Sequence, residues 1–312
     1  FKQKTAYEIR NCDWSSDVCS SDLAGVEAVL RLAEQSEGLI EGFRPGVMER
    51  LGLGPDVLLG RNPRLAIGRM TGWGQEGPIA HVAGHDINYI ALAGALFNIG
   101  TRGGPPSPPL NLVGDFGGGG MLLAFGMLAA ILRARESGEG QVVDAAMVDG
   151  TATLCASMFG RLAEGTFEEG RGKSSSNGGT HYYNAYECAD GEFISIASLE
   201  PQFYAELKEL LALDDAEFGE QMDPELWPEQ IDKLQQIFLT KTRDEWCEVL
   251  QQSDICFAPV LRFAEAPEHP HNRLRETFVE VDGIVQPAPS PRFSATPGAI
   301  SRPPAERGQH TD

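Results

Sequence analysis

The chain of 312 residues has little positive charge, few cysteines and no long apolar run. It carries 45 acidic residues against 25 basic ones, and its net charge of −20 argues against nucleic acid as a partner, because such binding rests on clustered cations. No uninterrupted apolar run reaches the roughly 20 residues of a membrane-spanning helix. We therefore expect neither a nucleic-acid partner nor a membrane.

Cysteine motifs are absent as well. Six cysteines occur, and none stands in a CxxC pair. Cys12 and Cys19 belong to an atypical N-terminal segment, and the others are Cys155, Cys188, Cys247 and Cys256. This usage predicts reduced thiols and a cytoplasmic location.

Common catalytic motifs are also lacking. The sequence has no G-x-S-x-G elbow, no zinc motif and no G-x-G-x-x-G dinucleotide fingerprint. His269 and His271 form an H-P-H sequence, but no third ligand stands at a suitable spacing, so we expect no metal site. These absences exclude the commonest hydrolytic, metal-dependent and hydride-transfer chemistries.

The first 23 residues resemble a translated sequencing adapter. Phe1 to Ile9 and Asp13 to Leu23 correspond to its two halves, and residues 10–12 fall where the index bases would stand. We set residues 1–23 aside and expect the fold to begin near Ala24, in the middle of a helix.

Strand and helix patterns alternate through the first half of the remaining chain, which predicts an α/β fold with a parallel sheet. Strands are expected near residues 39–41, 64–71 and from 141, a hairpin over 182–197, and acidic helices over 201–252. The expected parts are a large domain (24–164), a glycine-rich linker (165–180), a small α+β domain (181–285) and a C-terminal tail (286–312).

Two motifs carry the candidate chemistry: G84-H-D-I-N-Y89 and N111-L-V-G-D-F-G-G-G-G120. They supply His85, Asp86 as the expected N-cap of a helix over 86–100, and Asp115 before an apolar run. We expect Asp115 to end a strand or loop at the start of a buried helix, whose N–H groups after Asp115 could hold an oxyanion. Our hypothesis is that His85 and Asp115 stand on opposite faces of a carbon acid. A core histidine and a capping aspartate are the alternatives.

Two further features allow either a binding or a structural interpretation. Glu200 is either a functional carboxylate or the N-cap of a helix that begins at Pro201. A cluster of five arginines suits phosphate recognition, or else a salt-bridged surface. Its members are Arg44, Arg50, Arg61, Arg64 and Arg69.

Together the motifs resemble the α-methylacyl-CoA racemase branch of the family III CoA-transferases (CaiB/BaiF). The matching stretches include E41-G-F-R-P-G46, R69-M-T-G-W-G-Q75, G140-Q-V-V-D-A-A-M-V-D-G150 and the tripeptide from Pro259 to Leu261, in order and at compatible spacing. The resemblance implies a Rossmann-like large domain, a smaller α+β domain and an interlocked homodimer. It also implies that a first strand-helix unit with further CoA contacts is missing here.

The activity implied by the resemblance is inversion of the α-carbon of a 2-methyl-branched acyl-CoA, by two-base 1,1-proton transfer through an enolate. His85 and Asp115 would be the two bases, and Glu200 would orient and polarise His85. No cofactor is implied beyond the CoA moiety of the substrate. The implied CoA contacts are Arg44, Arg50, Gly84, Asp86, Ile87, Asn88 and Tyr89.

Two alternatives remain open. In a CoA-transferase of the same family, Asp115 would instead be a nucleophile that carries CoA between carboxylic acids. A CoA-binding protein without activity is the other alternative. The stretch S174-S-S-N-G-G-T-H-Y-Y183 also replaces an expected N-M-L-D-G-G-A-P-Y-Y and introduces His181. If this stretch lines the acyl site, its polarity argues against a long fatty or sterol-like chain.

Overall fold

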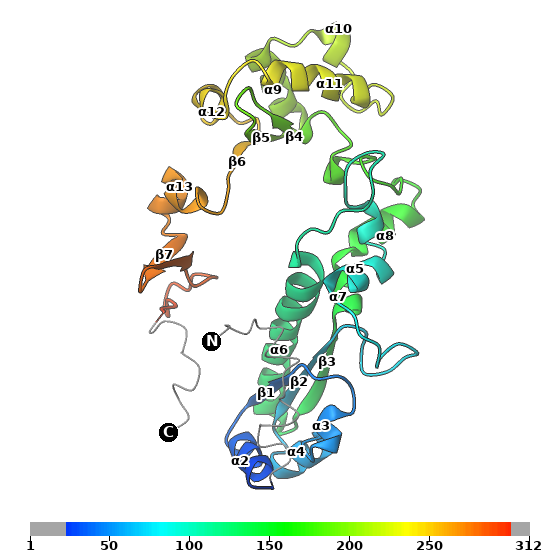
Figure 1. Ribbon diagram of the computed structural model, residues 1–312, viewed down its shortest axis with the longest axis vertical. Coiled ribbons are helices and arrows are strands. Elements are labelled where there is room, and N and C mark those ends of the chain that lie inside the picture. Colours follow the sequence, from blue (N-terminus) through cyan, green and yellow to red (C-terminus); the bar gives the residue numbers. More distant parts are fainter. Residues whose placement is uncertain (1–22, 301–312) are drawn as a thin grey trace, which may run out of the picture. The chain divides into compact units, whose positions relative to one another are not determined.

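The computed structural model describes residues 23–300, which form two compact units (Figure 1). The boundary lies between Gly179 and Thr180. The adapter-like segment lies outside the described residues except for Leu23, and the expected tail is described as far as residue 300. Each unit is presented by itself below.

The larger unit is built on a three-stranded parallel sheet in the order β1-β2-β3 (Figure 1). The strands are β1 (Gly38–Glu41), β2 (Ala66–Thr71) and β3 (Gln141–Ala146). The central strand β2 is almost wholly buried, as expected for a parallel strand covered on both faces. The α/β prediction and the three expected strands are confirmed.

Helices pack apolar side chains against this sheet in two clusters. Leu30, Leu58 and Ile67 belong to the first, formed by α2, α4 and the sheet. Ala66, Leu123 and Met127 belong to the second, formed with α6. The helix bounds are α2 (Leu23–Glu34), α3 (Val47–Arg50), α4 (Pro55–Arg61), α5 (Asp86–Leu92), α6 (Leu122–Ser137), α7 (Met147–Leu154) and α8 (Ala156–Ala163), with short 3-10 turns at Leu96–Asn98 and Ser175–Asn177.

The glycine-rich motif is helical from Leu112, so the prediction of a strand or loop at Asp115 was wrong. Residues Leu112–Met121 (η2) form a π-helix that continues directly into α6. Phe116 N–H donates to Asn111 O over 3.4 Å, in the i to i−5 pattern of such a helix. π-helices are rare and often mark functional sites.

The glycines of η2 allow a close contact with α7. A Cβ on Gly118 would lie 2.7 Å from Thr151 N, and a Cβ on Gly150 would overlap the carbonyl of Gly118. The two helix backbones therefore touch without intervening side chains. Close packing explains these glycines without a phosphate loop.

We predict that Gly150→Ala destabilises the larger unit by about 3 kcal/mol, because the new methyl group has no space and the backbones must separate. Urea unfolding would measure the change. Gly160→Ala is the matched control: Gly160 lies in α8 with no atom within 4 Å of an added Cβ, so alanine should be neutral or stabilising there. Equal stability of the two variants would contradict the steric argument.

The smaller unit contains an antiparallel sheet in the order β4-β5-β6 and a separate hairpin of β7 and β8. The expected hairpin over 182–197 and the acidic helices are confirmed, whereas β6 and β8 were missed. β6 contains Pro259, which an edge strand tolerates. The bounds are β4 (Tyr183–Glu187), β5 (Phe193–Ala197), α9 (Pro201–Leu211), α10 (Asp215–Phe218), α11 (Trp227–Phe238), α12 (Arg243–Leu250), β6 (Phe257–Val260), α13 (Pro270–Leu274), β7 (Phe278–Val281) and β8 (Ile284–Pro287).

The continuous helix Leu112–Ser137 is less buried than expected. It is long and apolar enough to cross a membrane by length and composition alone, although only 28% of its apolar window is buried. The core helix of a soluble protein passes the same test, so the test alone is weak evidence for a membrane span. The prediction of a buried helix was therefore wrong, and the expectation of no membrane contact stays a prediction.

All four cysteines in the described part of the chain are free thiols. Cys188 is buried in the smaller unit, and burial raises its pKa to about 11. Cys256, by contrast, is exposed.

Candidate active site

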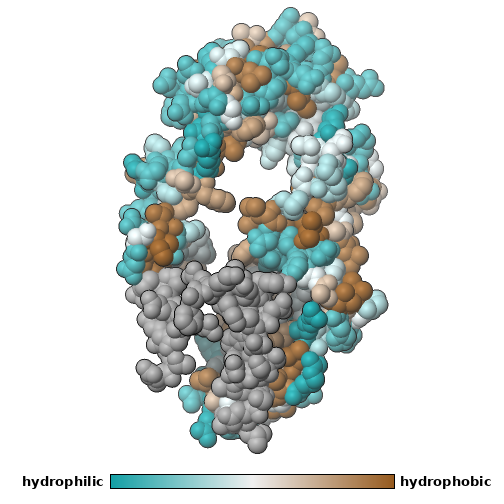
Figure 2. Space-filling model, in the orientation of Figure 1, coloured by the Kyte–Doolittle hydropathy of each residue, from teal (hydrophilic) through white to brown (hydrophobic). Residues whose placement is uncertain are grey.

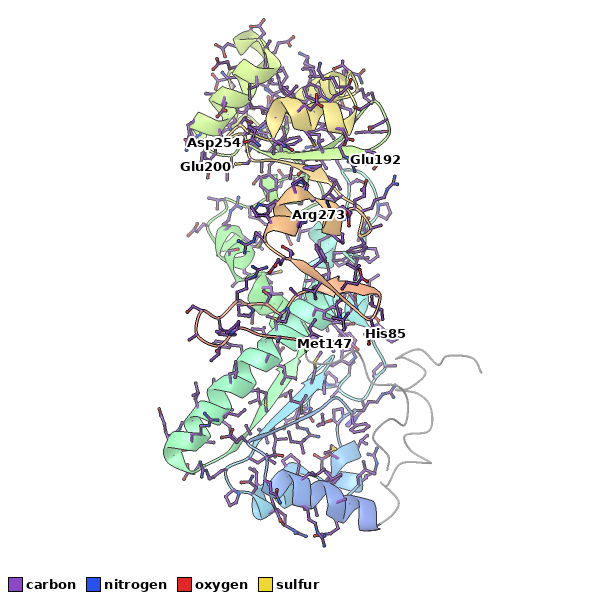
Figure 3. All side chains as sticks on the ribbon, turned by 90° about the vertical axis from the view of Figure 1, so that its left-hand side faces the viewer. His85, Met147, Glu192, Glu200, Asp254 and Arg273 are labelled. Atoms are coloured by element: carbon purple, nitrogen blue, oxygen red, sulfur yellow. The ribbon has the colours of Figure 1, made fainter. Side chains whose placement is uncertain are left out.

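The candidate site lies at the carboxyl ends of the strands in the larger unit, where open α/β sheets bind their ligands. β2 ends at Thr71 and β3 at Ala146. The segments that follow them are joined by a hydrogen bond from Val148 N–H to Gly72 O, 3.1 Å long. Figure 3 labels His85 and Met147 at this end of the sheet.

His85, rather than Asp86, is the N-cap of α5. Its backbone N–H donates to Asn88 Oδ1 over 3.1 Å, and its carbonyl accepts from the N–H groups of Asn88 and Tyr89. These bonds fix the backbone of His85, while its side chain remains exposed. The exposure excludes the interpretation of His85 as a core histidine.

Asp86 links this helix start to Asp115. Its Oδ2 accepts from Gly114 N–H over 2.7 Å and from Asp115 N–H over 2.8 Å. Asp115 is half-buried, and its own carboxylate accepts from Asn111 Nδ2 over 3.3 Å. The structure thus joins the two motifs that the sequence singled out, through the residue next to His85.

The expectation that N–H groups after Asp115 hold an oxyanion is wrong. The first of them, on Phe116, donates to Asn111 O, and later ones lie within the helix. The N–H groups of Gly114 and Asp115 themselves are taken by Asp86. A loop leading into the helix would have left these donors free, but the helix begins three residues earlier.

Tyr89 holds the loop that leads to His85. Its hydroxyl donates to Gly84 O, and its ring meets Trp73 edge to face at 4.8 Å. Trp73 Nε1 donates in turn to Val82 O over 3.1 Å. A Cβ on Gly72 would overlap the tyrosine ring, so glycine is required where strand β2 meets this loop.

Side chains of the G84-H-D-I-N-Y89 motif fall into two groups. Asp86 and Tyr89 are buried and bonded to protein backbone, whereas Ile87 and Asn88 are exposed. Contact of this motif with CoA stays a prediction. The exposed members offer the accessible side chains for it.

Arg69 braces the loop after β1. It is only 6% exposed, and its guanidinium binds Glu41 through Nε at 2.7 Å and Glu49 through Nη1 at 2.8 Å. The other oxygen of Glu41 accepts from Phe43 N–H over 2.7 Å. Two ion pairs of one buried arginine therefore fix both ends of the segment that carries Arg44.

The remaining arginines of the cluster differ in their partners. Arg61 binds Glu27 and Glu34, both at 2.7 Å, as the salt-bridged interpretation requires. Arg44 and Arg50 are exposed and form no ion pair with any residue between 23 and 300. Arg64 is likewise exposed and in no ion pair of the described residues, so three members of the cluster could bind an anionic ligand: Arg44, Arg50 and Arg64.

A cavity of about 330 Å³ lies in the larger unit between the segment that follows α5, the end of α7 and α8. Its wall is mostly apolar and includes Leu154, Met158 and Phe159. Val113, two residues before Asp115, also lines it. Sequence patterns did not reveal this cavity, because its wall combines segments far apart in the chain. Its volume lies at the small end of the range for ligand pockets.

The segment expected to line an acyl site is divided between the two units. Ser176 and Asn177 line the cavity just described. His181 instead lies in the core of the smaller unit and is 0% exposed. His181 therefore adds no polarity to the cavity.

The hydrogen bonds of His181 define its tautomer. Tyr204 donates its hydroxyl hydrogen to Phe218 O over 2.8 Å, so it must accept from Nε2–H of His181, also at 2.8 Å. Nδ1 is buried and finds no hydrogen-bond partner among the described residues. Burial lowers the pKa of His181 to about 4, and the ring is neutral at pH 7.

Glu200 belongs to the smaller unit (Figure 3). It precedes α9, and its carbonyl accepts from Tyr204 N–H over 3.0 Å. Its carboxylate is exposed and does not cap the helix, so the capping interpretation fails for the side chain. The predicted action of Glu200 on His85 stays a prediction.

Comparison with known proteins shows the family. Residues 21–311 match the family described as CoA-transferase family III. The chain belongs to this family. Two curated relatives are the alpha-methylacyl-CoA racemases of Mus musculus and Homo sapiens, at 44% and 42% identity. Each alignment covers 92% of this chain and 76% of the relative.

A solved structure of the same fold supports this membership. The crystal structure of Rv3272 from Mycobacterium tuberculosis matches with a TM-score of 0.76 at 28% identity, over 94% of this chain and 78% of the other. The curated description of Rv3272 is a probable fatty acyl-CoA transferase. The family III fold thus includes relatives named for two different reactions.

Proposed function

We propose that this chain is an α-methylacyl-CoA racemase, which inverts the α-carbon of 2-methyl-branched acyl-CoA thioesters. The observation that carries the proposal is the pair of hydrogen bonds that the backbone N–H groups of Gly114 and Asp115 donate to the carboxylate of Asp86. They hold a histidine and a carboxylate at two adjoining helix starts, as a two-base reaction requires. The identity of 44% to a curated racemase supports the same reaction.

In the proposed reaction, His85 and Asp115 exchange roles with the direction of turnover. One base removes the α-proton and leaves an enolate, and the other base delivers a proton to the opposite face. Inversion then needs neither a change of oxidation state nor a metal. Glu200 would accept a hydrogen bond from the imidazole of His85, and so orient and polarise it.

The enolate oxygen needs preorganised donors, because a thioester α-carbon is a weak acid. The N–H groups of Asp86 and Ile87 lie in the first turn of α5, where a helix provides no carbonyl acceptor for them. They follow His85 directly in the chain. We assign the oxyanion to this helix start instead of the one at Asp115.

The CoA moiety would bind along the same edge of the sheet. Arg44 and Arg50, exposed and without ion pairs in the described part of the chain, would contact its phosphates. Ile87 and Asn88 offer exposed side chains beside His85. No further cofactor is required, because the thioester itself activates the α-carbon.

The proposed enzyme is a homodimer. Exposed apolar side chains follow one face of η2 and α6, at spacings of three to five residues: Leu112, Phe116, Met121, Phe125, Leu128 and Leu132. Figure 2 shows apolar residues in brown on the face that the grey atoms leave visible. Large exposed apolar surfaces mark interaction sites, and a second copy of the chain is the partner we propose.

The acyl chain would occupy the cavity beside Val113. We predict that Met158→Trp, which fills this cavity, lowers kcat/KM at least about ten-fold for a long 2-methylacyl-CoA and leaves 2-methylbutanoyl-CoA nearly unchanged. Met222→Trp is the control, since Met222 is 56% exposed in the smaller unit. An equal loss with both substrates would contradict an acyl role for the cavity.

A CoA-transferase is the second candidate, because relatives at lower identity carry that name. The acetyl-CoA:oxalate CoA-transferase of Acetobacter aceti, for example, is 26% identical over 89% of this chain. In that reaction Asp115 would attack an acyl-CoA to form an anhydride and release CoA as a thiolate. The thiolate would then attack the aspartyl carbon of the anhydride, expel the acyl group as a carboxylate and leave CoA on Asp115 as a thioester. It is not favoured, because such a reaction gives no second proton-carrying role to His85.

NMR spectroscopy in deuterated water separates the two candidates. The protein would be incubated with one enantiomer of a 2-methylacyl-CoA, and in a parallel tube with a free carboxylate acceptor. Deuterium at the α-carbon, loss of optical purity and no new CoA ester would support the racemase. A new CoA ester without α-exchange would replace it with the transferase.

A further inference from the structure

We infer that Asp86 is the residue that positions both proton-transfer bases, and that it acts through the backbone instead of contacting CoA. The inference rests on the racemase function proposed above. Asp86 is only 5% exposed, while the next two residues, Ile87 and Asn88, are exposed. A ligand at the surface therefore meets its neighbours and not its carboxylate.

On one side the carboxylate fixes Asp115. Oδ2 accepts two short hydrogen bonds, from Gly114 N–H and Asp115 N–H. N–H groups at a helix start carry partial positive charge, and hydrogen bonds to a carboxylate are roughly twice as strong as neutral ones. Movement of the Asp115 backbone would break these buried bonds.

On the other side, a peptide bond joins Asp86 directly to His85. The N–H and carbonyl of His85 are bonded to Asn88 and Tyr89 in the first turn of α5. Asp86 is the first residue of that helix, and its main chain cannot shift without disturbing this turn. The single carboxylate thus ties the helix start of one base to the helix start of the other.

We call the contact of the Asp86 carboxylate with the backbone at Gly114 and Asp115 the joint. The sequence provides room for this joint at Gly114. A Cβ there would lie 2.7 Å from Asp86 Oδ2 and 3.1 Å from Ile90 Cγ2. The backbone of η2 reaches the carboxylate because this residue has no side chain. Asp86 and Gly114 therefore act as a matched pair, one from each motif.

One oxygen of Asp86 makes both bonds. Oδ1 is buried and has no hydrogen-bond partner among residues 23–300. Asparagine offers a similarly placed acceptor and can keep both bonds, whereas alanine leaves a buried and a part-buried N–H group without an acceptor. Asp86→Asn and Asp86→Ala therefore separate the positioning role from the mere presence of a side chain.

The test measures α-proton exchange in deuterated water from each enantiomer separately, with kcat and KM. A misplacement of about 1 Å can cost about 100-fold in rate. We expect Asp86→Ala to lower kcat about 100-fold for both enantiomers with little change in KM, and Asp86→Asn to recover most of the loss. Gly114→Ala, which disturbs the joint from the opposite side, should also slow both enantiomers.

Asp214→Ala is the matched control, because Asp214 also accepts a backbone N–H, from Ala216, but lies in the smaller unit. It should keep the wild-type rates. Absence of exchange in the wild-type protein would remove the proposed function itself. Wild-type exchange together with a folded Asp86→Ala variant that processes either enantiomer normally would overturn the role of Asp86 alone.

Circular dichroism and thermal unfolding would establish that each variant is folded. If Asp86→Ala does not fold, Asp86→Asn and Gly114→Ala decide the question. Loss confined to one enantiomer in Gly114→Ala, or a raised KM with unchanged kcat, would overturn the inference. Asp86→Asn that is folded but as inactive as a variant lacking a base would do so too.

Discussion

Replacing His85 with alanine should lower the rate of α-proton exchange from at least one enantiomer of a 2-methylacyl-CoA by a factor of about 100 to 10,000. The affinity for CoA should change little, because the side chain that is lost carries the proton and not the phosphates. His85 and Asn88 form the capping box of α5, and alanine retains one half of it, the bond from the backbone N–H of residue 85 to Asn88 Oδ1. Exchange of the α-proton in deuterated water, measured for each enantiomer, gives the result directly.

Asp115→Asn is the complementary variant. It keeps an acceptor for Asn111 and leaves the backbone bond to Asp86 in place, so the fold should be unaffected. Its loss should fall on the opposite enantiomer from that of His85→Ala. Equal residual exchange from both enantiomers in both variants would contradict the assignment of two bases.

The second large effect concerns the stability of the smaller unit below pH 7. Burial lowers the pKa of His181 to about 4, compared with about 6.5 in an unfolded chain. Between these two pKa values, the imidazole is therefore protonated in the unfolded chain and neutral in the folded core. The contribution of neutral His181 to the free energy of unfolding is fully present above pH 6.5 and is lost as the pH falls toward 4. A shift of this size corresponds to about 3 kcal/mol.

Urea unfolding between pH 7.5 and 4 would measure this loss. Trp227 and Trp246, which pack in the same core, provide the fluorescence signal. His181→Gln should flatten the pH dependence, since glutamine does not titrate. His81→Gln, at an exposed histidine of the larger unit, should leave it unchanged. Identical pH dependence in the wild-type protein and His181→Gln would contradict the lowered pKa.

Periodicity predicted the elements whose patterns are local. The strands of the larger unit and the β4–β5 hairpin follow from apolar runs bounded by turn residues. The helix over 86–100 was predicted too long, because α5 ends at Leu92 before Gly94, whose φ of 84° suits glycine. η2 was missed for the opposite reason: its glycines favour a loop locally, and only the contact with α7 accounts for them.

The candidate site shows the same limit. Residue types and their resemblance to a family identified His85 and Asp115, but not the bonds that join their motifs. Asp86 was assigned to CoA because it lies in the motif, whereas its side chain is buried against η2. His181 was expected to add polarity to the acyl site if its segment lined that site, whereas Tyr182, Tyr186 and Tyr204 contact it in a core. Such contacts join distant segments and leave no periodic signal in the sequence.

The contact between Gly118 and Gly150 limits how the gene can vary. Each single-nucleotide change in a glycine codon that alters the residue introduces a Cβ or stops translation. At both positions even the smallest such side chain meets backbone atoms of the facing helix. Neither codon has a nearby replacement that preserves the packing, and variation there requires a second change that moves a helix.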